Sequence, residues 1–217
     1  MKKQIIEIGK RLAEQGMIAG SDGNISVRLD ANRVLITPSG RPKGRLAENE
    51  LAVTDLDGRQ IEGALPLSSE SPMHLFVYKN RPEITACIHS HAPYATAGAV
   101  SGLGLPNDIL PEVVVFVGDI PLTDYAATGT DEVPAALEPY ISDCNAFLLK
   151  NHGLLTIGRT LEEAYNRHET VEHYARIIHL ARQQGKPVPL PPKEIERLRE
   201  LRRARERTTE NQAKDKK

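Results

Sequence analysis

The apolar positions along the chain change period several times, and each change marks an expected element. Ile5, Ile8 and Leu12 recur at helical spacing, which predicts a helix over about residues 2–15. Short apolar runs bounded by glycine, proline or asparagine follow, and such runs are typical of strands. We expect strands at residues 25–28, 33–36, 51–55, 60–62, 86–88, 113–117, 146–150 and 154–157.

Helical spacing returns in the second half of the chain. Pro72, with hydroxyl side chains shortly before it, predicts a helix start. Further helices are expected at residues 93–100, 132–141 and 161–184. Asp57-Gly58 between two short strands predicts a hairpin, so the first strands should form an antiparallel sheet. A chain of 217 residues is long enough for one domain with a sizeable core.

Composition and charge narrow the expected partners. The formal net charge is -1, 40% of residues are hydrophobic, and only 4% are aromatic, with no tryptophan. This balance is typical of a soluble globular protein and gives no reason to expect nucleic acid or a membrane as partner. No apolar run matches a signal peptide or a membrane span, so a cytoplasmic location is expected.

The last stretch differs from the body of the chain. Residues 186–217 carry 11 Lys and Arg against 6 Asp and Glu, whereas residues 1–185 carry 17 against 23. Ile195, Leu198 and Leu201 form one weak apolar stripe, which predicts a docked basic helix that frays from about Thr208. We therefore divide the chain into a main domain, 1–185, and a basic C-terminal segment, 186–217.

Three histidines suggest a metal site. Side chains at i and i+2 of a strand leave on the same face, so His89 and His91 can converge on one ion, although such a pair also arises by chance. His152 lies in a tight turn between two strands and can supply a third ligand. Three imidazoles with an open position are the ligand set of catalytic zinc sites.

One carboxylate and three turns accompany the histidines. Glu70 follows two serines at an expected helix start, where free N–H groups favour a negative group. His74 lies one helical turn further and is expected to be a packed helical histidine. Each turn alone is compatible with an ordinary turn or a helix cap, but together they could hold an oxyanion. The turn residues are Gly23, Asn24, Ser39, Gly40, Ser68 and Ser69.

Five short motifs occur in an order that resembles the class II aldolase/adducin family, most closely its zinc-dependent L-fuculose-1-phosphate aldolases. The motifs are Gly23-Asn24-Ile25-Ser26, Thr37-Pro38-Ser39-Gly40, Ser68-Ser69-Glu70, His89-Ser90-His91 and Asn151-His152-Gly153. The resemblance implies a three-layer α/β/α domain around a mostly antiparallel sheet, assembled as a homotetramer with active sites between subunits.

The resemblance also implies roles for the residues. The three histidines would bind zinc or another divalent metal, Glu70 would be the catalytic carboxylate, and the six turn residues would hold the substrate phosphate. The expected reaction makes or breaks a carbon–carbon bond in a ketose 1-phosphate through a dihydroxyacetone phosphate enediolate. The alternatives are a methylthioribulose-1-phosphate dehydratase or a sugar-phosphate epimerase on the same site, and a noncatalytic scaffold like adducin.

The chain departs from the fuculose type at two positions. Leu110 and Arg205 stand where that type has tyrosines, the first of which is its acid. A different acid would be needed, and Glu112 is a candidate. Tyr125 aligns with a further tyrosine of the type but is expected to lie in a structural turn.

Overall fold

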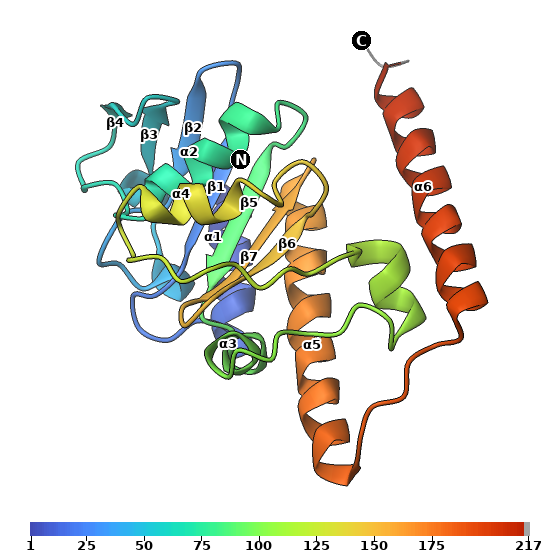
Figure 1. The fold of residues 1–217 in the computed structure, drawn as a ribbon. Coiled ribbons are helices and arrows are strands. Elements are labelled where there is room, and N and C mark those ends of the chain that lie inside the picture. The colour runs from blue at the N-terminus through green and yellow to red at the C-terminus, as the bar shows by residue number, and fades with distance from the viewer. Residues whose placement is uncertain (215–217) are drawn as a thin grey trace.

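A seven-stranded sheet forms the centre of the computed structural model, which describes the backbone of residues 1–214 and the side chains of residues 1–208 (Figure 1). The strand order is β4-β3-β2-β1-β5-β7-β6, and all neighbours pair antiparallel. The strands are β1 (Asn24–Arg28), β2 (Arg33–Ile36), β3 (Ala52–Asp55), β4 (Gln60–Glu62), β5 (Ala86–Ser90), β6 (Ala146–Leu149) and β7 (Gly153–Gly158).

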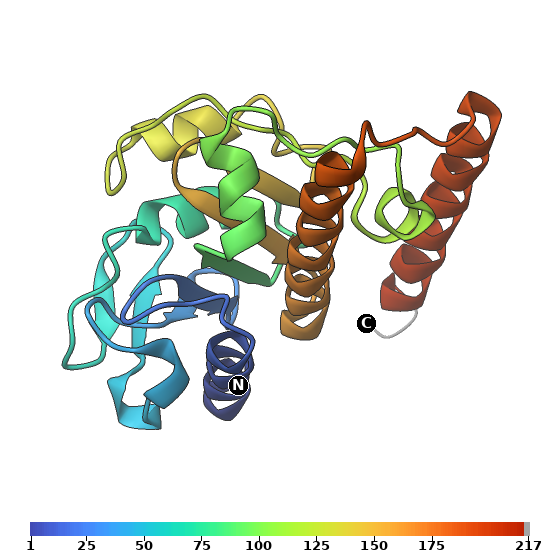
Figure 2. The ribbon, with the colours of Figure 1, turned by 90° about the horizontal axis from the view of Figure 1, so that it is seen from below.

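Helices cover both faces of this sheet and give three layers (Figures 1 and 2). Ile88 of β5 belongs to a core cluster built with α1, α3 and α5, whereas the neighbouring Cys87 belongs to a second cluster built with α2 and α4. The α-helices are α1 (Lys2–Glu14), α2 (Ser71–Asn80), α3 (Pro93–Val100), α4 (Glu132–Leu137), α5 (Leu161–Gln184) and α6 (Pro192–Lys214). The expected α/β/α architecture is confirmed.

The short helical turns η1 (Lys43–Arg45) and η2 (Glu48–Glu50) connect β2 to β3. Lys43 lies against Gly9 of α1, where a Cβ would come within 2.4 Å of the Lys43 carbonyl oxygen. Glycine at this position therefore lets α1 and η1 pack closely, which places Lys43 beside the loop that leads into β1.

The strand expected at residues 113–117 is wrong: these residues form a π-helical turn, η3 (Val113–Val117). Their β-branched run resembles a strand in composition, but Val113, Val114 and Val117 are buried and Phe116 is exposed, which is helical rather than alternating spacing. η3 packs between α5 and α6.

One helix end also differs from expectation. The helix α4 ends at Leu137 rather than at residue 141, because Pro139 cannot continue it. The helix α6 is described to Lys214, and the predicted fraying from about Thr208 stays a prediction. Figure 1 shows α6 standing apart from the sheet, against η3. Within residues 1–214, no helix has both the length and the apolar character that a membrane span needs.

Candidate active site

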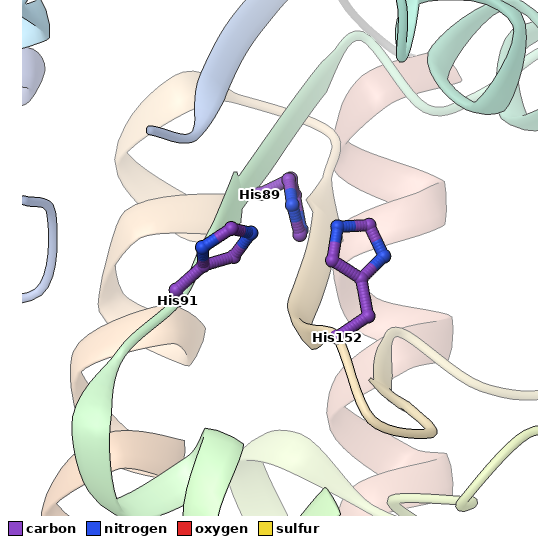
Figure 3. A group of neighbouring side chains, drawn as sticks. All are labelled: His89, His91 and His152. Carbon is purple, nitrogen blue, oxygen red and sulfur yellow. The ribbon is translucent and has the colours of Figure 1, made fainter. Parts of the chain in front are cut away.

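The three predicted histidines meet at one end of the sheet (Figure 3). His89 lies near the end of β5, His91 directly follows that strand, and His152 lies in the turn between β6 and β7. The candidate ligand atoms of the three rings all lie within 4.8 Å of one another, and the ring centroids are separated by 4.6–5.3 Å. The sequence prediction that these histidines converge is therefore confirmed, and they could hold a metal ion.

Two local features of the β6–β7 turn bring His152 to the other histidines. Asn151 has φ of 56°, a left-handed conformation that asparagine tolerates better than most residues. At Gly153, a Cβ would lie 2.6 Å from the Ser90 carbonyl oxygen, 3.0 Å from the His91 ring and 3.1 Å from the His89 ring. The absence of a side chain there lets β7 approach β5 directly beneath the histidines.

His89 has a free nitrogen that faces the cluster. Its Nδ1 donates a hydrogen bond to the Leu154 carbonyl oxygen at 3.0 Å, while its buried Nε2 has no hydrogen-bond partner among the described residues. Burial lowers the pKa of His89 to about 4, so the ring is neutral at pH 7 and Nε2 carries a lone pair. A buried lone pair without a donor fits a metal ion, and the bond from Nδ1 is the usual support of a ligating histidine.

Glu70, the N-cap residue of α2, lies between the histidines and β1. Its Oε1 is 2.8 Å from His152 Nε2, and its Oε2 is 2.7 Å from Asn24 Nδ2 and 3.4 Å from His89 Nε2. The last distance is a contact and not a hydrogen bond, because the neutral His89 ring has no proton on Nε2. Burial raises the pKa of Glu70, but His89, His152 and Asn24 together outweigh it, so the pKa lies well below its ordinary value. The carboxylate is ionised at neutral pH.

The three predicted turns come together beside Glu70. Ser39 N donates to the Pro66 carbonyl oxygen at 3.0 Å, and Pro38 forms a bridge with Leu67, so the second turn lies against the segment that leads into the third. Asn24 Nδ2 lies 3.3 Å from Ser68 Oγ, which joins the first turn to the third. Ser39, Gly40 and Ser69 are exposed, and Ser68 is half-buried.

Not all of these polar groups are free to bind a ligand. Ser68 Oγ accepts from Glu70 N at 3.3 Å and from Asn24 Nδ2, so its hydroxyl proton remains available to an anion. Asn24 is 1% exposed, and its amide bonds to Glu70, Ser68 and His74. The side chain of Asn24 is therefore part of the Glu70 environment, and its part in holding the phosphate stays a prediction.

The structure adds two charged residues that sequence reasoning missed. Lys43 is 2% exposed, and its Nζ donates to the Ser21 carbonyl oxygen at 2.5 Å in the first turn. Burial lowers the pKa of Lys43, while Asp22 and Glu70 oppose this effect. Asp22 Oδ2 also lies 3.3 Å from His91 Nδ1, an arrangement that orients the ring. Neither residue is part of a periodic sequence pattern. Only their contacts with residues that are distant in the sequence identify them.

The candidate acid lies elsewhere in the subunit. Glu112 is exposed directly before η3, and no hydrogen bond or ion pair joins it to Glu70 or the histidines in the part of the chain that the structure describes. Tyr125 is 65% exposed. Neither residue belongs to the cluster within one chain, and a role for Glu112 stays a prediction.

Comparison with known proteins identifies the family. The model described as Class II Aldolase and Adducin N-terminal domain matches residues 3–179. The L-fuculose phosphate aldolase of Methanococcus vannielii is 38% identical over 180 residues, which cover 82% of this chain and 95% of that protein. The 3-oxo-tetronate 4-phosphate decarboxylase of Haemophilus influenzae is 35% identical, with coverage of 82% and 86%. The 5-deoxy-D-ribulose 1-phosphate aldolase of Bacillus thuringiensis is 33% identical, with coverage of 91% and 92%.

Solved structures agree with these relatives. An L-fuculose 1-phosphate aldolase superimposes with a TM-score of 0.84 at 36% identity, covering 92% of this chain and 94% of that chain. The L-fuculose-1-phosphate aldolase from Thermus thermophilus gives a TM-score of 0.74 at 29% identity, with coverage of 86% and 97%. The named relatives are aldolases and a decarboxylase, which are lyases. This chain is an enzyme of the class II aldolase/adducin family.

Proposed function

We propose that this enzyme is a zinc-dependent aldolase that makes or breaks a carbon–carbon bond in a ketose 1-phosphate through the enediolate of dihydroxyacetone phosphate. The observation that carries the proposal is the position of the ionised Glu70 carboxylate, 2.8 Å from one of three clustered histidines and beside three anion-friendly turns. A base, a metal site and a phosphate site within one cluster are the parts that this chemistry requires.

In this proposal His89, His91 and His152 hold the metal. Zinc bound there would act as a Lewis acid that polarises the substrate ketone and stabilises the negative charge of the enediolate. The free lone pair of His89 Nε2 and the support of its Nδ1 by Leu154 favour this assignment. Imidazole ligands also accept manganese or cobalt, so the ligand set favours zinc without requiring it.

The turns and Lys43 bind the substrate phosphate. The Ser68 hydroxyl proton and the exposed serines and glycine of the second and third turns supply donors, and the Lys43 ammonium supplies a positive charge beneath the first turn. Gly23 has φ of 71°, and a Cβ there would lie 2.7 Å from the His89 carbonyl oxygen. The phosphate turn is thereby packed directly against the metal-binding strand, which anchors the substrate with its ketone toward the histidines.

Glu70 then acts as the base. It removes a proton from the carbon next to the ketone to give the enediolate, and the enediolate carbon then bonds to the aldehyde carbon. An acid, for which Glu112 is the candidate, protonates the alkoxide that this addition forms. In the cleavage direction Glu70 returns the proton to that carbon. His152 cannot both donate from Nε2 to Glu70 and use the same nitrogen as a ligand. When His152 gives up this hydrogen bond, Oε1 of Glu70 becomes free to accept the substrate proton.

A second candidate reaction is decarboxylation, favoured by the 35% identity to a 3-oxo-tetronate 4-phosphate decarboxylase. A 3-oxo acid that loses carbon dioxide leaves an enolate at the carbon next to its ketone, which is the same electronic species that the aldolase forms. The two reactions therefore use one site and differ in the group that leaves. Dehydration and epimerisation of a sugar phosphate are further alternatives at this site.

The test separates these reactions by their products. Zinc-loaded enzyme is incubated with L-fuculose 1-phosphate, 5-deoxy-D-ribulose 1-phosphate or 3-oxo-tetronate 4-phosphate, and dihydroxyacetone phosphate is measured by coupled reduction. We expect release together with an aldehyde from a ketose 1-phosphate, and no release by His152→Ala enzyme. If dihydroxyacetone phosphate is released only from the oxo acid, together with carbon dioxide, the enzyme is a decarboxylase and not an aldolase. Failure to release dihydroxyacetone phosphate from any of them would contradict the proposal.

We further propose that the enzyme is a cytoplasmic homotetramer with active sites between subunits. Family membership supports this assembly, and the exposed position of Glu112 is compatible with a contribution to a neighbouring site. Sedimentation equilibrium measures the assembly directly. A monomer at micromolar concentration would contradict it.

A further inference from the structure

A chain of buried polar side chains leads from the interior of the protein to Glu70. Its members lie between β1 and α2, and each is at most 1% exposed. Tyr78 OH lies 2.7 Å from Ser26 Oγ, and Ser26 Oγ lies 2.6 Å from His74 Nδ1. The other ring nitrogen, Nε2, contacts Asn24 Oδ1, and Asn24 Nδ2 lies 2.7 Å from Glu70 Oε2. The chain is Tyr78, Ser26, His74 and Asn24.

The Glu70 carboxylate, which follows Asn24, shows which way the hydrogen bonds run. An ionised carboxylate only accepts, so the Asn24 amide must present its NH₂ group to Glu70. The Asn24 carbonyl oxygen then faces His74, and an oxygen atom can only accept. His74 must therefore carry its proton on Nε2.

The rest of the chain follows from that tautomer. His74 is neutral, because complete burial lowers its pKa to about 3, so it has a single ring proton to place. With that proton on Nε2, Nδ1 accepts from the Ser26 hydroxyl. Ser26 Oγ in turn accepts from the Tyr78 hydroxyl. In this arrangement every hydrogen bond from Tyr78 to Glu70 has one donor and one acceptor.

We infer that His74 is a positioning residue that fixes the Asn24 amide so that its NH₂ group, and not its carbonyl oxygen, faces the Glu70 carboxylate. With the opposite tautomer the amide would turn over and place an oxygen about 2.7 Å from a carboxylate oxygen, which is repulsive. The inference rests on the proposed role of Glu70 as base. It also assigns His74 a function beyond packing.

The hydrogen bond from Asn24 affects both the orientation and the charge of the Glu70 carboxylate. The Asn24 hydrogen bond holds one oxygen of Glu70, which leaves the other oxygen to face the cluster. Loss of a hydrogen bond to a charged group that acts in the transition state lowers a rate by about 10- to 100-fold. The same NH₂ group also donates to Ser68 Oγ, so we expect the loss mainly in kcat, with a smaller rise in KM.

The first test measures the tautomer without measuring activity. Long-range ¹H–¹⁵N correlation of histidine-labelled protein, metal-free and zinc-loaded, distinguishes protonated from unprotonated ring nitrogens. The His74→Gln spectrum assigns the signals. We expect a neutral His74 protonated at Nε2 in both forms. A His74 protonated at Nδ1 would overturn the inference.

The second test measures proton exchange at dihydroxyacetone phosphate in deuterated water. Glutamine in His74→Gln keeps an N–H donor near the position of Nε2, whereas His74→Leu has none. We expect exchange to fall about 10- to 100-fold in His74→Leu and to recover largely in His74→Gln, with the larger part of the change in kcat and not in KM. Exchange at the wild-type rate in His74→Leu would overturn the inference, and so would equal losses in two folded variants.

A matched control shows how much of the change comes simply from losing a buried histidine. His168 is also fully buried and neutral, and its ring bonds to the Ser90 and Thr156 hydroxyls at 2.7 and 2.9 Å. We expect His168→Leu to lower Tm as His74→Leu does but to keep most of the exchange rate. If the wild-type enzyme exchanges no proton at all, the proposed function fails, while the tautomer measurement still decides the inference.

Discussion

The contact between Gly153 and the histidine-bearing strand makes a quantitative prediction for Gly153→Ala. The new Cβ would lie 2.6 Å from the Ser90 carbonyl oxygen, about 0.8 Å short of the 3.4 Å at which ordinary contacts begin. The backbone fixes the position of this Cβ, and two imidazole rings at 3.0 and 3.1 Å from it are also closer than ordinary contact. The strands must therefore separate, and such overpacking costs about 1–3 kcal/mol.

The displacement should weaken metal binding as well as stability. His152 precedes Gly153 directly, so movement of β7 carries one ligand away from the other two. We expect zinc affinity to fall by about 10- to 100-fold, comparable to the loss of a residue that orients a ligand. The assays are competition with a chromophoric chelator for affinity and calorimetry for Tm.

A matched glycine supplies the control. At Gly98 on α3 a Cβ would meet its nearest atoms at 3.7 Å or more, which is ordinary contact. We expect Gly98→Ala to bind zinc as the wild type does. Wild-type zinc affinity and Tm in Gly153→Ala would refute the reasoning that this glycine sets the spacing of the ligands.

Three further predictions concern the metal, the phosphate site and pH. Removal of zinc by chelator should lower stability, and adding zinc at about a thousand times its Kd should restore about 4 kcal/mol in the wild type but not in His152→Ala, as followed by thermal unfolding. Lys43→Met should raise KM for a phosphorylated substrate about tenfold with kcat nearly unchanged, whereas Lys79→Met, at an exposed ion pair with Asp57, should alter neither constant. Burial lowers the pKa of His168 to about 3, so the unfolded chain binds this proton below about pH 6.5 and the native state does not. Stability conferred by the neutral ring is thus complete above about pH 6.5 and is lost as pH falls toward about 3. His168→Leu should make the pH dependence of the unfolding free energy shallower by about 1.4 kcal/mol per pH unit in that window; an unchanged slope would contradict this assignment.

Local patterns predicted much of the fold and the metal site. The bounds of β2 and α3 match the expected ranges, because turn residues mark both ends of each segment. The i, i+2 spacing of His89 and His91 placed both rings toward one cluster, since strand periodicity fixes the face of a side chain. Asn151 marked the tight turn that presents His152.

The rest depended on contacts between distant parts of the chain. Val113–Val117 has the composition of a strand, but its burial between two helices favours a helical turn. Lys43 reaches Ser21 across 22 positions of sequence, and no local pattern indicates that contact. The sequence suggested that His74 is a packed helical residue, which is correct. Its bond to Asn24 becomes visible only when β1 and α2 are placed side by side.

Proton exchange at the C–H group next to the ketone of dihydroxyacetone phosphate, followed by proton NMR in deuterated water, tests the role of Glu70 as base most directly. This measurement requires no knowledge of the aldehyde. It follows only the removal of the proton next to the ketone, which is the step assigned to Glu70. We expect exchange by zinc-loaded wild-type enzyme and a loss of roughly a hundredfold or more, about 3 kcal/mol of barrier, in a Glu70→Gln variant that still binds zinc. Equal exchange by the wild type and Glu70→Gln would contradict this role.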